Sequence, residues 1–134
     1  MASIIKEIRL ETSAAHAWDA VRDFGAVHER VAPGFLTDAV LEGTTRIVTF
    51  ANGMVVRETL VAIDDEHRRL AYTNELEFAT HHSASVQIHA DGEGCRFIWI
   101  TDVLPDEIAA PISDMMDLGI AAAQRTLEGS PVGA

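Results

Sequence analysis

Paired cysteines and long hydrophobic runs are both missing from this sequence. Its single cysteine, Cys95, cannot form an internal disulfide, which is typical of proteins from a reducing compartment. No apolar run approaches the roughly 18 residues that a membrane-spanning helix needs. Charged residues interrupt residues 1–7 too early for the apolar core of a signal peptide. We therefore expect a cytoplasmic protein without stable membrane insertion.

Basic residues are also scarce. Lysine and arginine number 10 against 21 aspartate and glutamate residues, which gives a formal net charge of -11. The ten basic residues are scattered along the chain and form no patch. Because a surface of this charge repels phosphate backbones and anionic membranes, we expect no nucleic-acid partner.

Motifs for metal or cofactor binding are not found either. Metal-ligand pairs favour a spacing of two residues on a strand or four on a helix. His81 and His82 are adjacent and point to opposite faces, and the other four histidines are isolated. No phosphate-binding glycine loop and no Ser-His-Asp signature is present. We expect no metal and no cofactor, and we interpret Cys95 as a small core residue.

The chain is long enough to build a core without cross-links. Its 134 residues are 48% hydrophobic and 23% charged, as in ordinary soluble proteins. A chain of this length buries about two-thirds of its unfolded surface. The sequence predicts a single domain over residues 1–134, with residues 130–134 as a frayed tail.

Periodicity predicts the order of the secondary structure. Helical spacing predicts a helix from Ala14 to Phe24, which Thr12 or Ser13 caps and Gly25 ends, and a short helix over residues 26–32. A long C-terminal helix opens at residues 105–106, with Pro111 in its first turn or at a kink, and ends at Gly129. Alternating residues predict seven strands, over residues 2–11, 35–42, 45–51, 54–63, 69–78, 83–90 and 95–104.

The arrangement of these elements predicts a cavity. One-sided alternation is typical of an antiparallel sheet with one covered face, and only the C-terminal helix is long enough to cover it. The two short helices cannot fill the space under the far end of the sheet, and small molecules bind in such gaps. The prediction is an α+β fold in which a curved antiparallel sheet of about seven strands wraps around the C-terminal helix.

Strand alternation also indicates which side chains face this cavity. Arg46, Glu58, Asn74 and His82 are polar residues on otherwise apolar faces. A buried unpaired charge costs several kcal/mol, so Glu58 needs a partner, a water or a proton. Arg46 is a plausible partner, although it is placed well along its strand from Glu58. Two interpretations stay open: a structural ion pair or solvated pocket end, or a site where Glu58 and His82 hydrogen-bond or protonate a ligand.

The other predicted ligand contacts are apolar or small. The predicted inward faces of the strands over residues 54–63 and 69–78 also include Ala62, Leu76 and Phe78, near the strand ends. On the C-terminal helix, the methionines offer an adaptable surface. Together with the four polar residues, the predicted ligand-binding set is Val48, Phe50, Val56, Leu60, Tyr72, Ala84, Phe97, Trp99, Ile112, Met115, Met116 and Gly119.

Four segments, at residues 12–24, 45–58, 69–72 and 95–99, are similar to sequence patterns of one known group. They resemble the START-like, or helix-grip (SRPBCC), superfamily, and more narrowly its polyketide cyclase/dehydrase and lipid-transport branch. The resemblance implies the helix-grip fold and a ligand-facing position at Glu58, as in its hormone-receptor members. Members often carry Trp-Pro where this chain has Ala32-Pro33, so we expect a different pocket mouth.

Three functions follow as hypotheses, because this superfamily includes enzymes, receptors and carriers. The first is binding of a small hydrophobic molecule, such as a lipid, an aromatic polyketide or an isoprenoid. The second is a cyclase or dehydratase that uses Glu58 or His82, or both, as catalytic residues for proton transfer. The third is a protein-interaction module with a vestigial pocket. A homodimer is compatible with the sequence, although no feature requires one.

Overall fold

The computed structural model describes residues 2–129 of the chain. The strands and helices follow the predicted order, and the expected tail at residues 130–134 lies outside the described residues. The elements are β1 (Ala2–Leu10), α1 (Ala14–Val21), α2 (Val27–Arg30), β2 (Leu36–Glu42), β3 (Thr45–Phe50), β4 (Val55–Asp64), β5 (Arg69–Glu75), β6 (His81–Asp91), β7 (Gly94–Leu104) and α3 (Ala109–Gly129), with 3₁₀ turns at Phe24–Ala26 and Asp106–Ile108.

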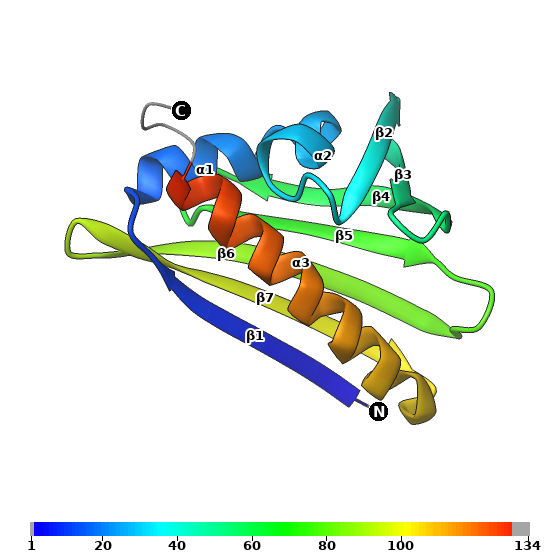
Figure 1. Cartoon of the computed structure of the whole chain (residues 1–134). Coiled ribbons are helices and arrows are strands. Elements are labelled where there is room, and N and C mark those ends of the chain that lie inside the picture. The colour runs from blue at the N-terminus through cyan, green and yellow to red at the C-terminus, as the bar shows by residue number, and fades with distance from the viewer. Residues whose placement is uncertain (1, 130–134) are drawn as a thin grey trace.

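The seven strands form one antiparallel sheet in the order β1-β7-β6-β5-β4-β3-β2. Consecutive strands are hairpin neighbours from β2 to β7, and β1 joins the far edge beside β7. Helix α3 lies across one face of this sheet, while α1 and α2 lie at one end of it (Figure 1). The predicted helix-grip architecture is therefore confirmed. No helix within residues 2–129 is both long and apolar enough to cross a membrane.

The core lies between the sheet and α3. Leu10, Ile88 and Leu127 are fully buried in its main part, which also takes in the apolar side of α1. The first half of α3 packs Ile112 and Met116 against the β1 and β7 end of the sheet. Each such side chain contributes about 1.5–3 kcal/mol when it is fully removed from water. Because this apolar side of α3 is continuous, the helix stays in contact with the sheet along its length.

The N-terminal helices are shorter than the sequence predicts. Ser13 caps α1 as expected, since its hydroxyl accepts a hydrogen bond from the His16 N–H at 3.1 Å. The helix ends at Val21 instead of Phe24, and Gly25 does not adopt a left-handed conformation. The carbonyl of Phe24 instead accepts a hydrogen bond from Arg46. The chain forms a 3₁₀ turn at Phe24–Ala26 instead of continuing the helix, and the Phe24 carbonyl in this turn binds the buried guanidinium.

Two strand predictions were wrong at their ends. A bulge between Leu60 and Ala62 shifts the register of β4 against β5, so Ile63 pairs with the buried Leu70 and Ala62 no longer shares the inward face. Strand β5 stops at Glu75, and Phe78 lies in the following loop with 49% of its surface exposed. The alternating pattern continued past both points, so periodicity alone gave no sign of either change.

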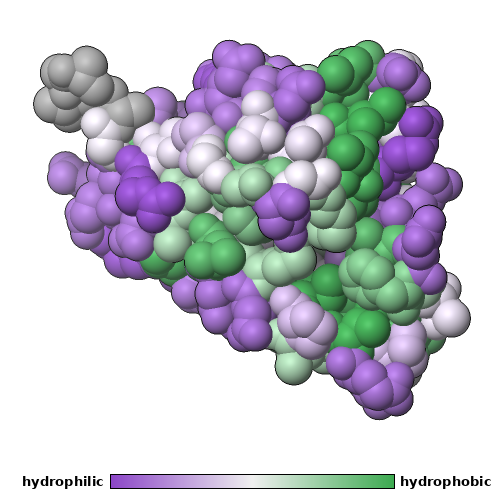
Figure 2. Space-filling model, turned by 45° about the vertical axis from the view of Figure 1, so that its right-hand side comes forward, coloured by the Kyte–Doolittle hydropathy of each residue, from purple (hydrophilic) through white to green (hydrophobic). Residues whose placement is uncertain are grey.

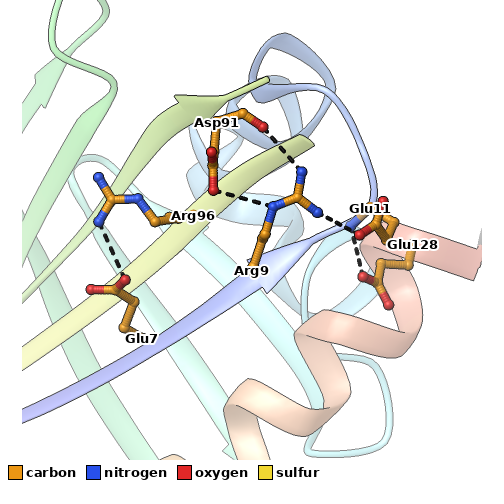
Figure 3. A network of polar contacts seen from close by, with 6 residues as sticks. All are labelled: Glu7, Arg9, Glu11, Asp91, Arg96 and Glu128. Carbon is orange, nitrogen blue, oxygen red and sulfur yellow. Dashed lines mark hydrogen bonds and ion pairs between the residues drawn. The ribbon is translucent and has the colours of Figure 1, made fainter. Parts of the chain in front are cut away.

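A network of exposed charged residues joins β1 to the ends of β6 and α3 (Figure 3). Arg9 donates hydrogen bonds to the side chain and the carbonyl of Asp91, both at 3.1 Å, and pairs with Glu11. The Glu11 N–H donates to Glu128 of α3 at 2.7 Å. Surface ion pairs contribute little stability. Their effect here is to fix where the first strand and the last helix meet.

Candidate ligand-binding site

A cavity of about 110 Å³ lies between the inward face of the sheet and α3. Strands β3 to β7 supply one wall, α3 supplies the opposite wall, and the α1–α2 segment closes one end. The prediction that a gap remains under the sheet agrees with this geometry. Thirteen of the sixteen predicted ligand-binding residues line the cavity: Arg46, Phe50, Val56, Glu58, Tyr72, Asn74, His82, Phe97, Trp99, Ile112, Met115, Met116 and Gly119.

Three predicted residues do not line the cavity, although all three are at least partly buried. Val48 is fully buried in a cluster with Leu36 and Val56. Ala84 belongs to the main core, and Leu60 packs against that core from its edge. These residues lie on the inward face of the sheet, as strand alternation predicts, but they pack into the core and not against the cavity.

The four polar residues lie in one row across the sheet. Arg46 pairs directly with Glu58, and Glu58 pairs with Asn74 on the next strand. Asn74 and His82 each lie one residue beyond the last paired residues of β5 and β6. Side chains opposite each other on neighbouring strands have Cβ atoms about 4.5–5.5 Å apart. We call these four residues the polar row.

The Arg46–Glu58 end of the polar row is a closed ion pair. Arg46 Nε donates to Glu58 Oε1 at 2.6 Å, and both residues are only 5% exposed. Arg46 also donates to the Phe24 carbonyl at 3.1 Å. Its guanidinium lies over the rings of Phe24 and Tyr72, at 4.0 and 4.9 Å from their centres. Glu58 therefore has the partner that its burial demands.

The expectation that Arg46 is displaced along its strand from Glu58 was wrong. The β3–β4 hairpin turns at Asn52, and Arg46 and Glu58 are equally far from that residue. A register that pairs Val48 with Val56 therefore also places Arg46 opposite Glu58. The turn alone sets this pairing.

The other end of the polar row has unused hydrogen-bonding atoms. Asn74 Oδ1 and His82 Nδ1 are buried and have no partner. Burial lowers the pKa of His82 to about 4, so its ring is neutral at pH 7. Buried polar atoms are nearly always hydrogen-bonded in folded proteins. This end of the row is therefore where a ligand gains most from a polar contact.

Tyr72 lies beside the ion pair and stays protonated. Burial, and then the Glu58 carboxylate, raise the pKa of its hydroxyl above the ordinary value. Thr101 is 1% exposed and also lines the cavity. Within residues 2–129, no group of three or more His, Cys, Asp or Glu side chains could hold a metal ion. The site thus offers neutral polar groups and one internally neutralised ion pair.

Strand parity missed the residues that close the cavity at the α1–α2 end. These residues come from helices and their connections, where alternation gives no information. Apolar side chains at helical spacing were the available signal, because Val21 continues the apolar stripe of the first helix and Val27 and Val31 are four residues apart. The additional lining residues in this region are Val21, Val27, Val31, Ala32, Phe35 and Leu36.

A second, open hollow adjoins the cavity at the loop between β5 and β6. Asn74 and His82 line both spaces, together with Met54, Leu76 and Phe78. The unpaired end of the polar row therefore lies where the cavity approaches the surface. We call this region, defined by those five residues, the mouth.

Hydrophobic residues also reach the surface elsewhere. On the face shown in Figure 2, a band of hydrophobic residues runs down the right-hand side among mostly hydrophilic ones. Val40 and Leu41 on β2 are 49% and 52% exposed, and Leu118 on α3 is 65% exposed. Scattered apolar side chains of this kind are common on soluble proteins.

The sequence match identifies the family. Residues 1–129 match the family described as polyketide cyclase / dehydrase and lipid transport. The chain belongs to this family. None of the curated proteins compared with it is a significant match. The polyketide cyclase/dehydrase family assignment agrees with the START-like resemblance of the sequence.

Solved structures share the fold of this family member. A Thermobifida fusca protein is 27% identical, with a TM-score of 0.78 over 95% of this chain and 91% of that chain. A START superfamily protein from Mycobacterium smegmatis is 13% identical, with a TM-score of 0.73 over 95% and 94% of the two chains. A Thalictrum flavum norcoclaurine synthase point mutant, in complex with a transition-state analogue, is 18% identical, with a TM-score of 0.64 over 94% and 93%.

Proposed function

We propose that this protein binds a small, largely apolar molecule in the cavity under α3. The observation that carries the proposal is an apolar cavity whose wall contains buried polar atoms without partners, at Asn74 and His82. Leaving such atoms unpaired costs about 1–3 kcal/mol each, and a ligand that bonds to them recovers part of this free energy. The family description, which includes lipid transport, supports the same function.

An enzymatic role is the second candidate, because the norcoclaurine synthase shares the fold and the family includes cyclases and dehydrases. Two observations favour binding over chemistry. Glu58 accepts a hydrogen bond from Arg46 at 2.6 Å, so this carboxylate is already engaged within the protein. A histidine with a pKa of about 4 is a weak base at neutral pH.

The interaction-module hypothesis rests on exposed residues such as Val40 and Leu41. The cavity, with its buried polar atoms, supports the binding of a small molecule better than these exposed side chains support a protein partner. We keep the cytoplasm as the proposed location, because Cys95 is a free and fully buried thiol. We also propose that residues 1–134 act as one domain, since the family match spans most of them.

Binding can be tested with N-phenyl-1-naphthylamine, a neutral probe that fluoresces in apolar surroundings. Met115 lines the cavity and is half-buried, so Met115→Trp fills space there at small cost to folding. We expect saturable binding to the wild type and at least tenfold weaker binding to Met115→Trp. Leu118→Trp on the exposed side of the same helix is the matched control and should bind like the wild type.

Absence of saturable binding to the wild type would contradict the proposal, as would equal affinity in the two tryptophan variants. Native mass spectrometry of freshly purified protein provides an independent check. We expect a co-purified small molecule in the wild type, in reduced amount in Met115→Trp.

A further inference from the structure

The charge around the cavity limits the class of ligand. Among the described residues that line the cavity, Arg46 carries the only fixed positive charge. The hollow beside the mouth adds Arg57, which already faces the carboxylates of Glu42 and Glu75. Its guanidinium is already bonded to Glu58 and to the Phe24 carbonyl, and two aromatic rings cover it. An anionic ligand would therefore enter a site without a free cation, in a chain of net charge -11. Burying such an unpaired charge is strongly unfavourable.

The unpaired atoms at the mouth show what the ligand must offer. Asn74 Oδ1 is a hydrogen-bond acceptor and needs a donor. His82 Nδ1 donates or accepts according to the tautomer of its neutral ring. A hydroxyl group has one proton to donate and lone pairs with which to accept, so it can donate to Asn74 Oδ1 while it accepts from His82 in the tautomer that carries its proton on Nδ1. A carboxylate only accepts and leaves Asn74 Oδ1 unpaired.

Strand register places Asn74 and His82 side by side at the mouth. Asn74 and His82 each lie one residue beyond the pair formed by Thr73 and Ser83, on adjacent strands and on the inward face. Both residues also line the mouth, whereas the cavity beyond them is walled by Trp99, Phe97 and the α3 methionines. A ligand with one polar end therefore fits with its apolar body inward and its polar group at the mouth.

We propose that the ligand is an uncharged, largely apolar molecule whose hydroxyl group binds Asn74 Oδ1 and His82 Nδ1 at the mouth. This inference rests on the proposed function, because it assigns a ligand class to the same cavity. It adds that the Arg46–Glu58 end of the polar row is structural and that the Asn74–His82 end selects the ligand.

Three probes with the same ring system separate the possibilities: naphthalene, 2-naphthol and 2-naphthoic acid, each displacing N-phenyl-1-naphthylamine at pH 7. Naphthalene lacks a polar group, 2-naphthol carries a neutral hydroxyl, and 2-naphthoic acid is ionised. We expect 2-naphthol to bind about tenfold tighter than naphthalene, and 2-naphthoic acid to bind more weakly than 2-naphthol.

Substitutions show which residues cause the preference for 2-naphthol over naphthalene. Asn74→Leu and His82→Phe should each reduce the advantage of 2-naphthol over naphthalene to about twofold or less, while naphthalene still binds. His89→Phe is the matched control, since His89 is on the same strand but on its outward face, and it should keep the tenfold preference.

The outcomes distinguish this inference from the proposed function. If N-phenyl-1-naphthylamine does not bind, both fail. If it binds but naphthalene competes as well as 2-naphthol, or 2-naphthoic acid competes best, the hydroxyl assignment is overturned and the cavity remains a binding site. A preference that persists in both Asn74→Leu and His82→Phe also overturns the assignment.

Discussion

At the scale of single residues, the polar row contains two different kinds of buried group. Arg46 and Glu58 satisfy each other, whereas Asn74 and His82 each leave an atom unpaired. Removing a side chain from the first pair should therefore change stability, and removing one from the second pair should change ligand binding. This difference makes the two ends of the row separable by mutation.

Breaking the buried ion pair should destabilise the fold more than removing it completely. We expect Arg46→Met or Glu58→Leu alone to lower the free energy of unfolding by about 3–5 kcal/mol, because each leaves a buried charge without its partner. The double variant should lose less than either single variant, because no buried charge is left without a partner. Urea unfolding of the four proteins measures this coupling.

The exposed pair Arg57–Glu75, on the outward face of strands β4 and β5, is the control for this cycle. Its closest N and O atoms are 3.7 Å apart, and the side chains are 50% and 78% exposed. The corresponding cycle, with Arg57→Met and Glu75→Leu, should give a coupling below about 1 kcal/mol. A buried coupling no larger than the exposed one would refute the structural role of Arg46–Glu58.

His82 should make stability fall in mild acid. Its pKa is about 4 in the folded protein, below the ordinary value of 6.5, so the unfolded chain binds more protons between these pH values. The contribution of the neutral His82 ring to the free energy of unfolding is therefore fully present above pH 6.5 and is lost progressively as the pH falls toward 4. At pH 5 the loss relative to pH 7 is about 2 kcal/mol.

This acid effect is measured as a difference between variants, because carboxyl groups also titrate in this range. His82→Phe should lack the extra loss between pH 7 and pH 5, and His89→Phe should retain it. If the free energy of unfolding falls by the same amount between pH 7 and pH 5 in the wild type and in His82→Phe, burial does not lower the pKa of His82.

At the scale of elements, α3 packs tightly against two aromatic rings at Gly119. A Cβ atom there would lie 2.9 Å from Trp99 Cζ3 and 3.0 Å from Phe35 Cε2. The missing side chain lets two aromatic rings pack directly against the helix. Gly119 therefore serves packing, although glycine inside a helix costs about 1 kcal/mol relative to alanine.

Gly119→Ala should consequently destabilise the protein by about 1–2 kcal/mol despite the better helix propensity, because the rings must move. It should also weaken binding of N-phenyl-1-naphthylamine, since Trp99 and Phe35 line the cavity. Gly129→Ala is the control, because nothing lies within 4 Å of its added Cβ. Stability of Gly119→Ala equal to that of the wild type would indicate that the rings relax freely.

The secondary-structure elements also show how much of the fold and of the site could be predicted from the sequence. Alternation identified every strand, and parity placed Arg46, Glu58, Asn74 and His82 on the inward face. Their alignment into one row depends on hairpin register, which single-strand periodicity does not contain. The β4 bulge after Leu60 and the early end of α1 depend on contacts with distant residues, so local pattern could not reveal them.

At the scale of the whole molecule, the first strand pairs with the last and forms one edge of the open sheet. Residues of β1 pair with β7 over their full length, from Ala2 with Val103 to Leu10 with Cys95. Gly94 permits this contact, since a Cβ there would lie 2.5 Å from the Leu10 carbonyl oxygen. The charged network around Arg9 and Asp91 lies at the same end (Figure 3). The fold is thus anchored far from the mouth.

Because the β1–β7 contacts near Gly94 that anchor the fold lie away from the mouth, the polar row is suitable for protein engineering. Its four positions come from four different strands, so no two of them are neighbours in the chain. Asn74 and His82 could be varied freely in a combinatorial library, while Arg46 and Glu58 would be exchanged only as a unit. Such a library would sample new ligand preferences on an unchanged scaffold.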